Sequence, residues 1–199
     1  MLKPRSGTPA DLLAVGLGNP GADYERTRHN LGADVVSLLA DRHGGKLKPR
    51  RATHSLEAEV RVDGRLLALA LPQTFMNESG MAAAPLVRRH GIDDLARLVV
   101  IHDELDLPRG RVKVKLGGGT AGHNGLKSIQ AHLHGSGFAR VRIGVGKPPG
   151  RQSGIDYVLH APRGSERAEL DVAVEDGADA VEMILVEGVE AAMNRFNAA

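Results

Sequence analysis

One histidine and one aspartate lie in sequence contexts where they can do acid–base chemistry together. His29 falls near the start of an expected helix, and Asp103 comes just after an apolar run over residues 98–101 that we expect to be a strand. Functional groups of open α/β sheets gather at the carboxyl ends of strands, so Asp103 is a candidate partner for the imidazole. Histidine titrates near neutral pH and is therefore the natural general base. A structural histidine and a carboxylate that caps a turn are the alternative interpretation.

Several other kinds of catalysis lack the residues they need. The chain contains no cysteine, which excludes a thiolate nucleophile, and it has no Gly-x-Ser-x-Gly string to present a serine. It also lacks a His-Glu-x-x-His string, and His132 and His134 have no obvious third ligand for zinc. We therefore expect no metal and no cofactor.

Two glycine-rich strings and one asparagine precede expected helices. Residues 16–21 spell Gly-x-Gly-x-x-Gly, as in dinucleotide-binding proteins, but Asn-Pro-Gly within that string is itself a turn signal. Residues 117–122 contain four glycines whose backbone N–H groups can face a phosphate, although the Lys-Ser/Thr ending of a P-loop is missing. A flexible connector is the alternative for 117–122, and an N-cap is the alternative for Asn77.

Positive charge is concentrated in the first three quarters of the chain. Residues 151–199 hold four Lys and Arg against ten Asp and Glu, whereas the whole chain has a net charge of +2. Residues 109–116 alternate basic and apolar side chains, which predicts a strand with one basic face. Such a face can bind a polyanion without reading its sequence. This hypothetical phosphate track consists of Arg109, Arg111, Lys113, Lys115, Arg140 and Arg142, with Lys147 beyond it.

The order of the expected elements positions these residues. Strands are expected over residues 12–17, 56–62, 65–71, 98–101, 109–116 and 138–145, with a turn at 63–64. Helices are expected over 27–42, 77–90, 125–133 and from 165 onward, and residues 147–154 are expected to form a loop. This alternation predicts an α/β fold, and 199 residues suit a single domain, with residues 1–11 flexible.

The sequence also predicts a cytoplasmic location. The absence of cysteine agrees with a reducing compartment, and the first twelve residues lack the apolar stretch of a secretory signal. No apolar run approaches the ~20 residues needed to cross a bilayer.

Taken together, these strings resemble the bacterial peptidyl-tRNA hydrolase family. The matching text is VGLGNPGADYERTRHN, PQTFMNESG, HDELDLPRG, KLGGGTAGHNGLKSI and FARVRIGVGKPPG, in the family's order and spacing across most of residues 13–150. The last fifty residues resemble the family only loosely. Ala121 is a departure, because many members carry glycine there.

The resemblance implies a single domain with a mixed central sheet flanked by helices. It also implies hydrolysis of the ester between a peptide and the 3′-terminal ribose of tRNA, which recycles tRNA from peptidyl-tRNA released by stalled ribosomes. In the family pattern His29 is the base, Asp103 orients it, and Asn19 acts beside them. Asn19, Asn77 and Asn124 line the peptide and ribose groove, and Tyr24 and Phe75 contact the 3′ end of the substrate. Met76 and His123, within the matching strings, complete the expected substrate-binding set.

The residue inventory agrees with such a mechanism. Without a cysteine or a serine elbow, water is the expected nucleophile, activated by a neutral His29. The expected partner is peptidyl-tRNA, bound through its 3′ CCA end and acceptor stem, with no membrane involved and no sequence feature that demands a dimer. Two alternatives remain open: a non-catalytic RNA-binding module of the same fold, and a nucleotide-dependent α/β enzyme that uses Gly16, Gly18 and Gly21.

Overall fold

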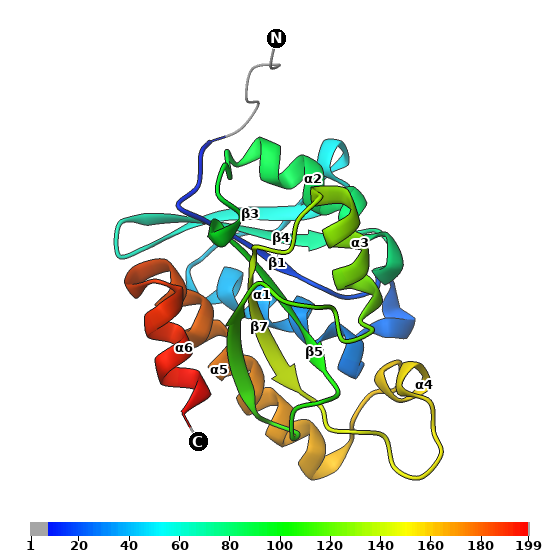
Figure 1. The fold of residues 1–199 in the computed structure, drawn as a ribbon. Coiled ribbons are helices and arrows are strands. Elements are labelled where there is room, and N and C mark those ends of the chain that lie inside the picture. Colours follow the sequence, from blue (N-terminus) through cyan, green and yellow to red (C-terminus); the bar gives the residue numbers. More distant parts are fainter. Residues whose placement is uncertain (1–7, 199) are drawn as a thin grey trace.

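In the computed structural model, which describes residues 8–198, seven strands form one mixed sheet in the order β2-β3-β4-β1-β5-β7-β6 (Figure 1). The central strands β4, β1, β5 and β7 are parallel, and the outer pairs β2–β3, β3–β4 and β6–β7 are antiparallel. The strands are β1 Leu12–Gly16, β2 Lys48–Arg50, β3 Ser55–Val62, β4 Arg65–Pro72, β5 Leu98–Glu104, β6 Val112–Leu116 and β7 Ala139–Gly144.

Helices cover both faces of the sheet. Figure 1 shows α1, α5 and α6 on one side and α2 and α3 on the other, with α4 set apart from both groups. The helices are α1 Leu31–Arg42, α2 Ser79–Arg89, α3 Asn124–Leu133, α4 Gly154–Val158, α5 Gly164–Glu187 and α6 Val189–Asn197. None of the helices in the described part of the chain combines the length and apolarity needed to span a bilayer.

The two faces of the sheet bury separate apolar clusters. Successive residues of a strand point to opposite faces, so Leu12 and Ala14 of β1 pack toward α1 and α5, whereas Leu13 and Val15 pack toward α2 and α3. Continuous burial of β1 and β5 explains why both read as unbroken apolar runs rather than as alternating ones.

Two glycines bring α1 unusually close to the ends of β1 and β5. A Cβ added at Gly32 would lie 2.1 Å from the carbonyl oxygen of Ile101, and one added at Gly16 would lie 2.2 Å from the carbonyl oxygen of Gly32. The first turn of α1 therefore rests directly on the strand backbone. This close contact sets the position of the turn that precedes α1.

The predicted elements are largely confirmed, with several shifted boundaries. The helix expected from residue 27 begins as a 3-10 turn over Arg28–Asn30 and becomes α1 at Leu31. Strand β5 continues to Glu104, so Asp103 lies within the strand, and the strand expected from residue 109 begins only at Val112. The helical stretch after residue 165 breaks at Gly188, whose φ is 95°. Strand β2 and helix α4 were not predicted.

Both ends of the described chain are tied to the sheet. The sequence predicts flexibility for residues 1–11, of which residues 1–7 lie outside the described residues. By contrast, Ala10 is buried, its N–H donates to the carbonyl of His90, and the Asp11 carboxylate accepts from Leu66 N–H. At the other end, the Asn197 side chain accepts from Val114 N–H at 2.9 Å and donates to Val114 carbonyl at 2.8 Å, along the outer edge of β6.

Candidate active site

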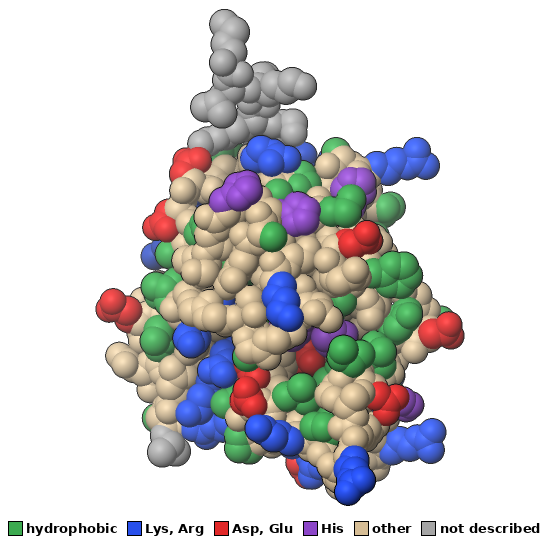
Figure 2. Space-filling view, turned by 45° about the vertical axis from the view of Figure 1, so that its right-hand side comes forward, with side chains coloured by type: hydrophobic (Ala, Val, Ile, Leu, Met, Phe, Trp, Pro, Cys, Tyr) green, Lys and Arg blue, Asp and Glu red, His purple; other side chains and the backbone are tan. Residues whose placement is uncertain are grey.

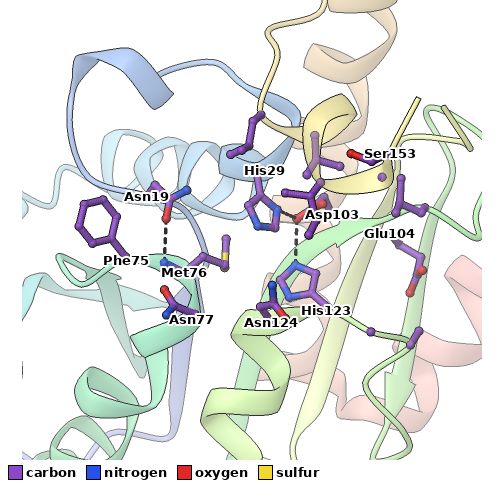
Figure 3. Close-up of a pocket in the computed structure, with 17 residues that line it drawn as sticks. Asn19, His29, Phe75, Met76, Asn77, Asp103, Glu104, His123, Asn124 and Ser153 are labelled. Atoms are coloured by element: carbon purple, nitrogen blue, oxygen red, sulfur yellow. Dashed lines mark hydrogen bonds and ion pairs between the residues drawn. The ribbon is translucent and has the colours of Figure 1, made fainter. Parts of the chain in front are cut away.

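A cavity of about 680 Å³ opens at the carboxyl ends of β1 and β5 (Figure 3). This is the sheet edge at which α/β proteins place their functional groups. The lining contains six polar residues expected from the sequence, namely Asn19, His29, Asn77, Asp103, His123 and Asn124. It also has an apolar part that the sequence did not predict, namely Leu105, Ile155, Val158 and Leu159.

His29 and Asp103 form the hydrogen-bonded pair expected from the sequence. His29 Nδ1 lies 2.9 Å from Asp103 Oδ1, and because an ionised carboxylate only accepts, the ring nitrogen must be the donor. This bond leaves Nε2 of a neutral imidazole as an acceptor. The turn that carries His29 is fixed by Asn30, whose side chain bonds both the N–H and the carbonyl of Asn19 at 2.9 Å.

A second imidazole binds the same carboxylate oxygen. His123 Nε2 lies 3.0 Å from Asp103 Oδ1, and His123 Nδ1 accepts from Leu126 N–H at the start of α3. Asp103 is only 3% exposed. Burial by itself would raise the pKa of this carboxyl, but the two imidazoles and their hydrogen bonds outweigh burial and hold the pKa well below its usual range. Asp103 is therefore ionised at the centre of the site.

His29, Asp103 and His123 are also close enough to hold a metal ion. One ligand atom from each lies within 4.8 Å of the others, and among the described residues no other such trio occurs. The hydrogen-bond pattern does not favour this use. Both ring nitrogens that face Asp103 carry protons as donors, and a metal would require both rings to change tautomer.

His102, which precedes Asp103 in β5, is fully buried. Its Nδ1 donates to the carbonyl of Asp103 at 2.7 Å, and its ring meets that of His123 edge-on at 4.9 Å. Burial and the neighbouring His123 lower the pKa of His102 to about 3, so His102 stays neutral. Nothing in the sequence indicated that the His102 ring packs against the ring of His123.

The three expected asparagines line the same cavity as His29 and Asp103. Asn19 Oδ1 accepts from the N–H of Met76 at 2.7 Å, which fixes the oxygen and leaves the amide NH₂ as a donor (Figure 3). Asn124 is the first residue of α3, directly after the His123 N-cap, and Asn77 lies in the 3-10 turn before α2. The turn at residues 19–21 thus places the side-chain amide of Asn19 in the cavity. Close packing explains the neighbouring glycine, since a Cβ at Gly18 would lie 2.9 Å from Asn30.

The aromatic and sulfur-containing residues expected to bind substrate lie in and around the cavity mouth. Phe75 and Met76 both line the cavity, but Phe75 is 53% exposed whereas Met76 is buried. Tyr24 does not line the cavity. Its ring meets that of Phe75 nearly at right angles, with centroids 6.4 Å apart, which extends the aromatic rim beyond the cavity.

The hypothetical phosphate track divides into residues with different surroundings. Lys113 and Lys115 of β6 stand opposite Arg142 and Arg140 of β7. Arg140 is buried, its guanidinium donates to the carbonyls of Gly118 and Gly119, and burial lowers its pKa. The sequence analysis expected Arg140 on an exposed basic face, and this expectation is wrong: Arg140 is buried and holds the glycine-rich loop in place.

The remaining arginines of the track already have protein partners. Arg142 Nε bonds Glu104 at 3.2 Å, Arg109 pairs with Glu169 of α5 at 2.7 Å, and Arg111 donates to the carbonyl of Ala198. Arg109 and Arg111 precede β6 and do not continue its basic face. In Figure 2, Lys and Arg side chains gather at the lower left of the face shown.

Comparisons with known proteins agree with the fold. Residues 13–199 match the family model described as peptidyl-tRNA hydrolase. The peptidyl-tRNA hydrolase of Mycobacterium tuberculosis H37Rv is 49% identical over 187 residues, which cover 94% of this chain and 97% of that protein. The corresponding protein of Rhodococcus erythropolis is 48% identical, with coverage of 93% and 97%.

Among solved structures, the peptidyl-tRNA hydrolase of Acinetobacter baumannii aligns with a TM-score of 0.88 at 36% identity, covering 96% of this chain and 97% of that one. The chain therefore belongs to the peptidyl-tRNA hydrolase family.

Proposed function

We propose that this protein hydrolyses the ester bond between the peptide and the 3′-terminal ribose of peptidyl-tRNA, with His29 as the general base. The observation that carries this proposal is the pairing of His29 with an ionised, buried Asp103 in a cavity that also receives three amide side chains. Membership in the family agrees with the reaction. We also propose that the reaction takes place in the cytoplasm, that the protein acts as a monomer, and that it needs no cofactor.

The proposed chemistry begins with a water molecule between the base and the substrate carbonyl. His29 Nε2 removes a proton as the water oxygen attacks the carbonyl carbon, and Asp103 stabilises the imidazolium that forms. When the tetrahedral intermediate collapses, the carbon–oxygen bond to the ribose breaks. The imidazolium then returns its proton to the ribose oxygen, so the products are a free peptide acid and tRNA. Such assistance by a general base typically raises the reaction rate by ~10²–10⁴-fold.

The amides supply the polar contacts that this reaction needs. Asn77 or Asn124 can donate to the developing oxyanion, a role in which loss of one donor costs ~2.7–4 kcal/mol in other hydrolases. The NH₂ of Asn19 is oriented by the bond from Met76 N–H and can reach the peptide group next to the ester. A site shaped for an acylated nitrogen would disfavour a charged free amine, which must be desolvated. We infer that ordinary aminoacyl-tRNA is spared for this reason.

Strand β6 is proposed to hold the acceptor stem. Arg142 is paired with Glu104, and Arg140 is bonded to the glycine-rich loop, so the ammonium groups of Lys113 and Lys115 are the part of the track proposed to meet phosphates. Tyr24 and Phe75 are proposed to contact the CCA end. The corresponding test is the salt dependence of KM, which should rise steeply between low and physiological salt. A flat KM would remove the phosphate track from the proposal.

The decisive experiment compares N-acetyl-aminoacyl-tRNA with the unblocked aminoacyl-tRNA. We expect the wild-type protein to release only the blocked amino acid. The His29→Ala variant should lose turnover by ~10²–10⁴-fold while binding the same tRNA with unchanged affinity. Equal turnover by both forms would remove His29 from the mechanism. Binding without turnover by the wild type would favour the RNA-binding module instead.

A further inference from the structure

The residue directly before the proposed base makes an unusual set of contacts. Arg28 is only 6% exposed, although its side chain carries a permanent charge. Its Nη1 donates to the carbonyls of Tyr157 at 3.1 Å and His160 at 2.8 Å, and its Nε and Nη2 donate to Glu166 Oε1 at 2.9 and 2.7 Å. The guanidinium also stacks over the Tyr157 ring, 4.0 Å from the centroid. A buried charge is tolerated only when it is paired and hydrogen-bonded in this way.

These contacts join three parts of the fold at one point. Arg28 belongs to the turn that carries His29, the two carbonyls lie at the end of α4 and just beyond it, and Glu166 lies in the first turn of α5. The backbone adds one bond, since Arg28 N–H donates to His160 carbonyl at 3.4 Å. A planar guanidinium suits this task because its donors point in several fixed directions at once.

The segment held by Arg28 forms one wall of the cavity. Ile155 and Val158 of α4, and Leu159 just beyond it, line the cavity. Figure 3 shows Ser153, the residue before α4, across the cavity from Asn19 and Asn77. Ile155 is 65% exposed and lines the cavity, so its side chain is available for contact with a bound group. Val158 and Tyr157 are buried, and the Tyr157 hydroxyl donates to the Val145 carbonyl at 3.0 Å. These contacts attach the five-residue helix α4 to the end of β7.

We propose that Arg28 is a positioning residue that fixes the α4 wall relative to His29, so that the acyl part of the substrate meets an apolar surface beside the base. This proposal rests on the proposed function. It assigns to the arginine of the turn a role in binding the acyl group rather than in proton transfer. The guanidinium itself faces the α4 carbonyls and Glu166, so it does not act on the reacting atoms.

The test uses Arg28→Gln and Arg28→Lys, with Arg42→Gln as the matched control. Arg42 also pairs with acidic residues of α5, namely Glu175, Asp179 and Glu182, and none of these partners belongs to α4. The steady-state kcat and KM are measured with N-acetyl-leucyl-tRNA and N-acetyl-glycyl-tRNA. Hydrogen exchange of the amides at 155–160 is followed in the same samples.

For Arg28→Gln we expect KM for the leucyl substrate to rise about tenfold, with a smaller rise for the glycyl substrate and a change in kcat of less than about threefold. Exchange at 155–160 should accelerate while exchange in α1 stays unchanged. Arg28→Lys should fall between wild type and Arg28→Gln, because one ammonium cannot bridge both carbonyls and Glu166. Arg42→Gln should match the wild type in both readouts.

Unchanged KM and unchanged exchange in Arg28→Gln would overturn the proposal, as would a loss of kcat alone. If Arg28→Gln does not fold, Glu166→Gln serves instead, because it keeps the two carbonyl bonds and removes only the carboxylate. It should shift KM and exchange in the same direction by a smaller factor, and no shift in either would overturn the proposal. Failure of the proposed function would look different: the wild type would cleave neither substrate, while the exchange data would still report on α4.

Discussion

The two walls of the cleft are built in different ways. His29 and Asp103 stand on a wall made of β1, β5 and the start of α1, where Gly16 and Gly32 allow backbone to touch backbone. The opposite wall is the five-residue helix α4 with its flanking loops, held by Arg28 and by burial of Tyr157 and Val158. The groups proposed to cleave the ester thus lie on backbone that is closely packed. The surface proposed to meet variable peptides rests on a few anchors, as binding surfaces on loops commonly do.

The strongest test of the rigid wall is Asp103→Asn. The carboxamide keeps the shape but no longer stabilises an imidazolium, and its NH₂ group can force the wrong His29 tautomer. By analogy with the acid of a serine triad, kcat should fall by up to ~10⁴-fold with KM nearly unchanged. The measurement is single-turnover hydrolysis of N-acetyl-aminoacyl-tRNA. If Asp103→Asn raised KM and left kcat unchanged, Asp103 would serve substrate binding rather than proton transfer.

A second test adds one carbon where α1 meets the sheet. The Cβ in Gly32→Ala would meet the Ile101 carbonyl at 2.1 Å, so α1 must move away from β5. We expect a loss of about 1–3 kcal/mol in the free energy of unfolding, together with a lower kcat, because the His29 turn moves with the helix.

Gly119→Ala is the control for that substitution. Nothing lies within 4 Å of a Cβ at this position, so the change in stability should stay within about 0.5 kcal/mol. Chemical denaturation of both variants gives the free energies. Equal stabilities would show that the close contact at Gly32 is not rigid.

The smallest effect on catalysis is expected at Glu57, a buried residue of β3 whose carboxylate contacts Arg89 and His90 at the end of α2. Burial alone would raise the pKa of this carboxyl, but hydrogen bonds from His90, Thr53 and Ser55 lower it to about 2. Its stabilising contribution is therefore complete above the ordinary pKa of a glutamate and is lost as pH falls toward 2.

Glu57→Gln should accordingly cost about 1–3 kcal/mol at pH 7, and the difference from wild type should shrink as the solution is acidified from pH 5 toward pH 2. Urea denaturation at several pH values measures this difference, and KM at pH 7 should not change. A gap that is independent of pH would mean that the carboxylate charge does not stabilise the fold.

The sequence predicted the rigid wall far better than the α4 wall. Apolar runs and glycine turns located β1, β5 and the helices beside them, and matching strings identified the polar side chains that the structure gathers in one cavity. Helix α4 was missed because its five residues are too few for a helical period and because it directly follows a stretch rich in Pro, Gly and Arg.

Long-range contacts explain the other differences. Arg28 gave no signal as an anchor, since its partners lie more than 125 positions away in sequence. Arg140 was expected on an exposed basic face, but nothing in the alternation of β7 could show that a glycine-rich loop folds over it.

The bond pair between Asn197 and Val114 has a consequence for how molecules of this protein meet one another. An outer strand with free backbone groups invites a strand from a second molecule to add to the sheet. Here one carboxamide occupies both the N–H and the carbonyl of Val114, as a neighbouring strand would. A second strand could pair with β6 at Val114 only by displacing Asn197, so this contact disfavours strand addition along the edge that carries Lys113 and Lys115.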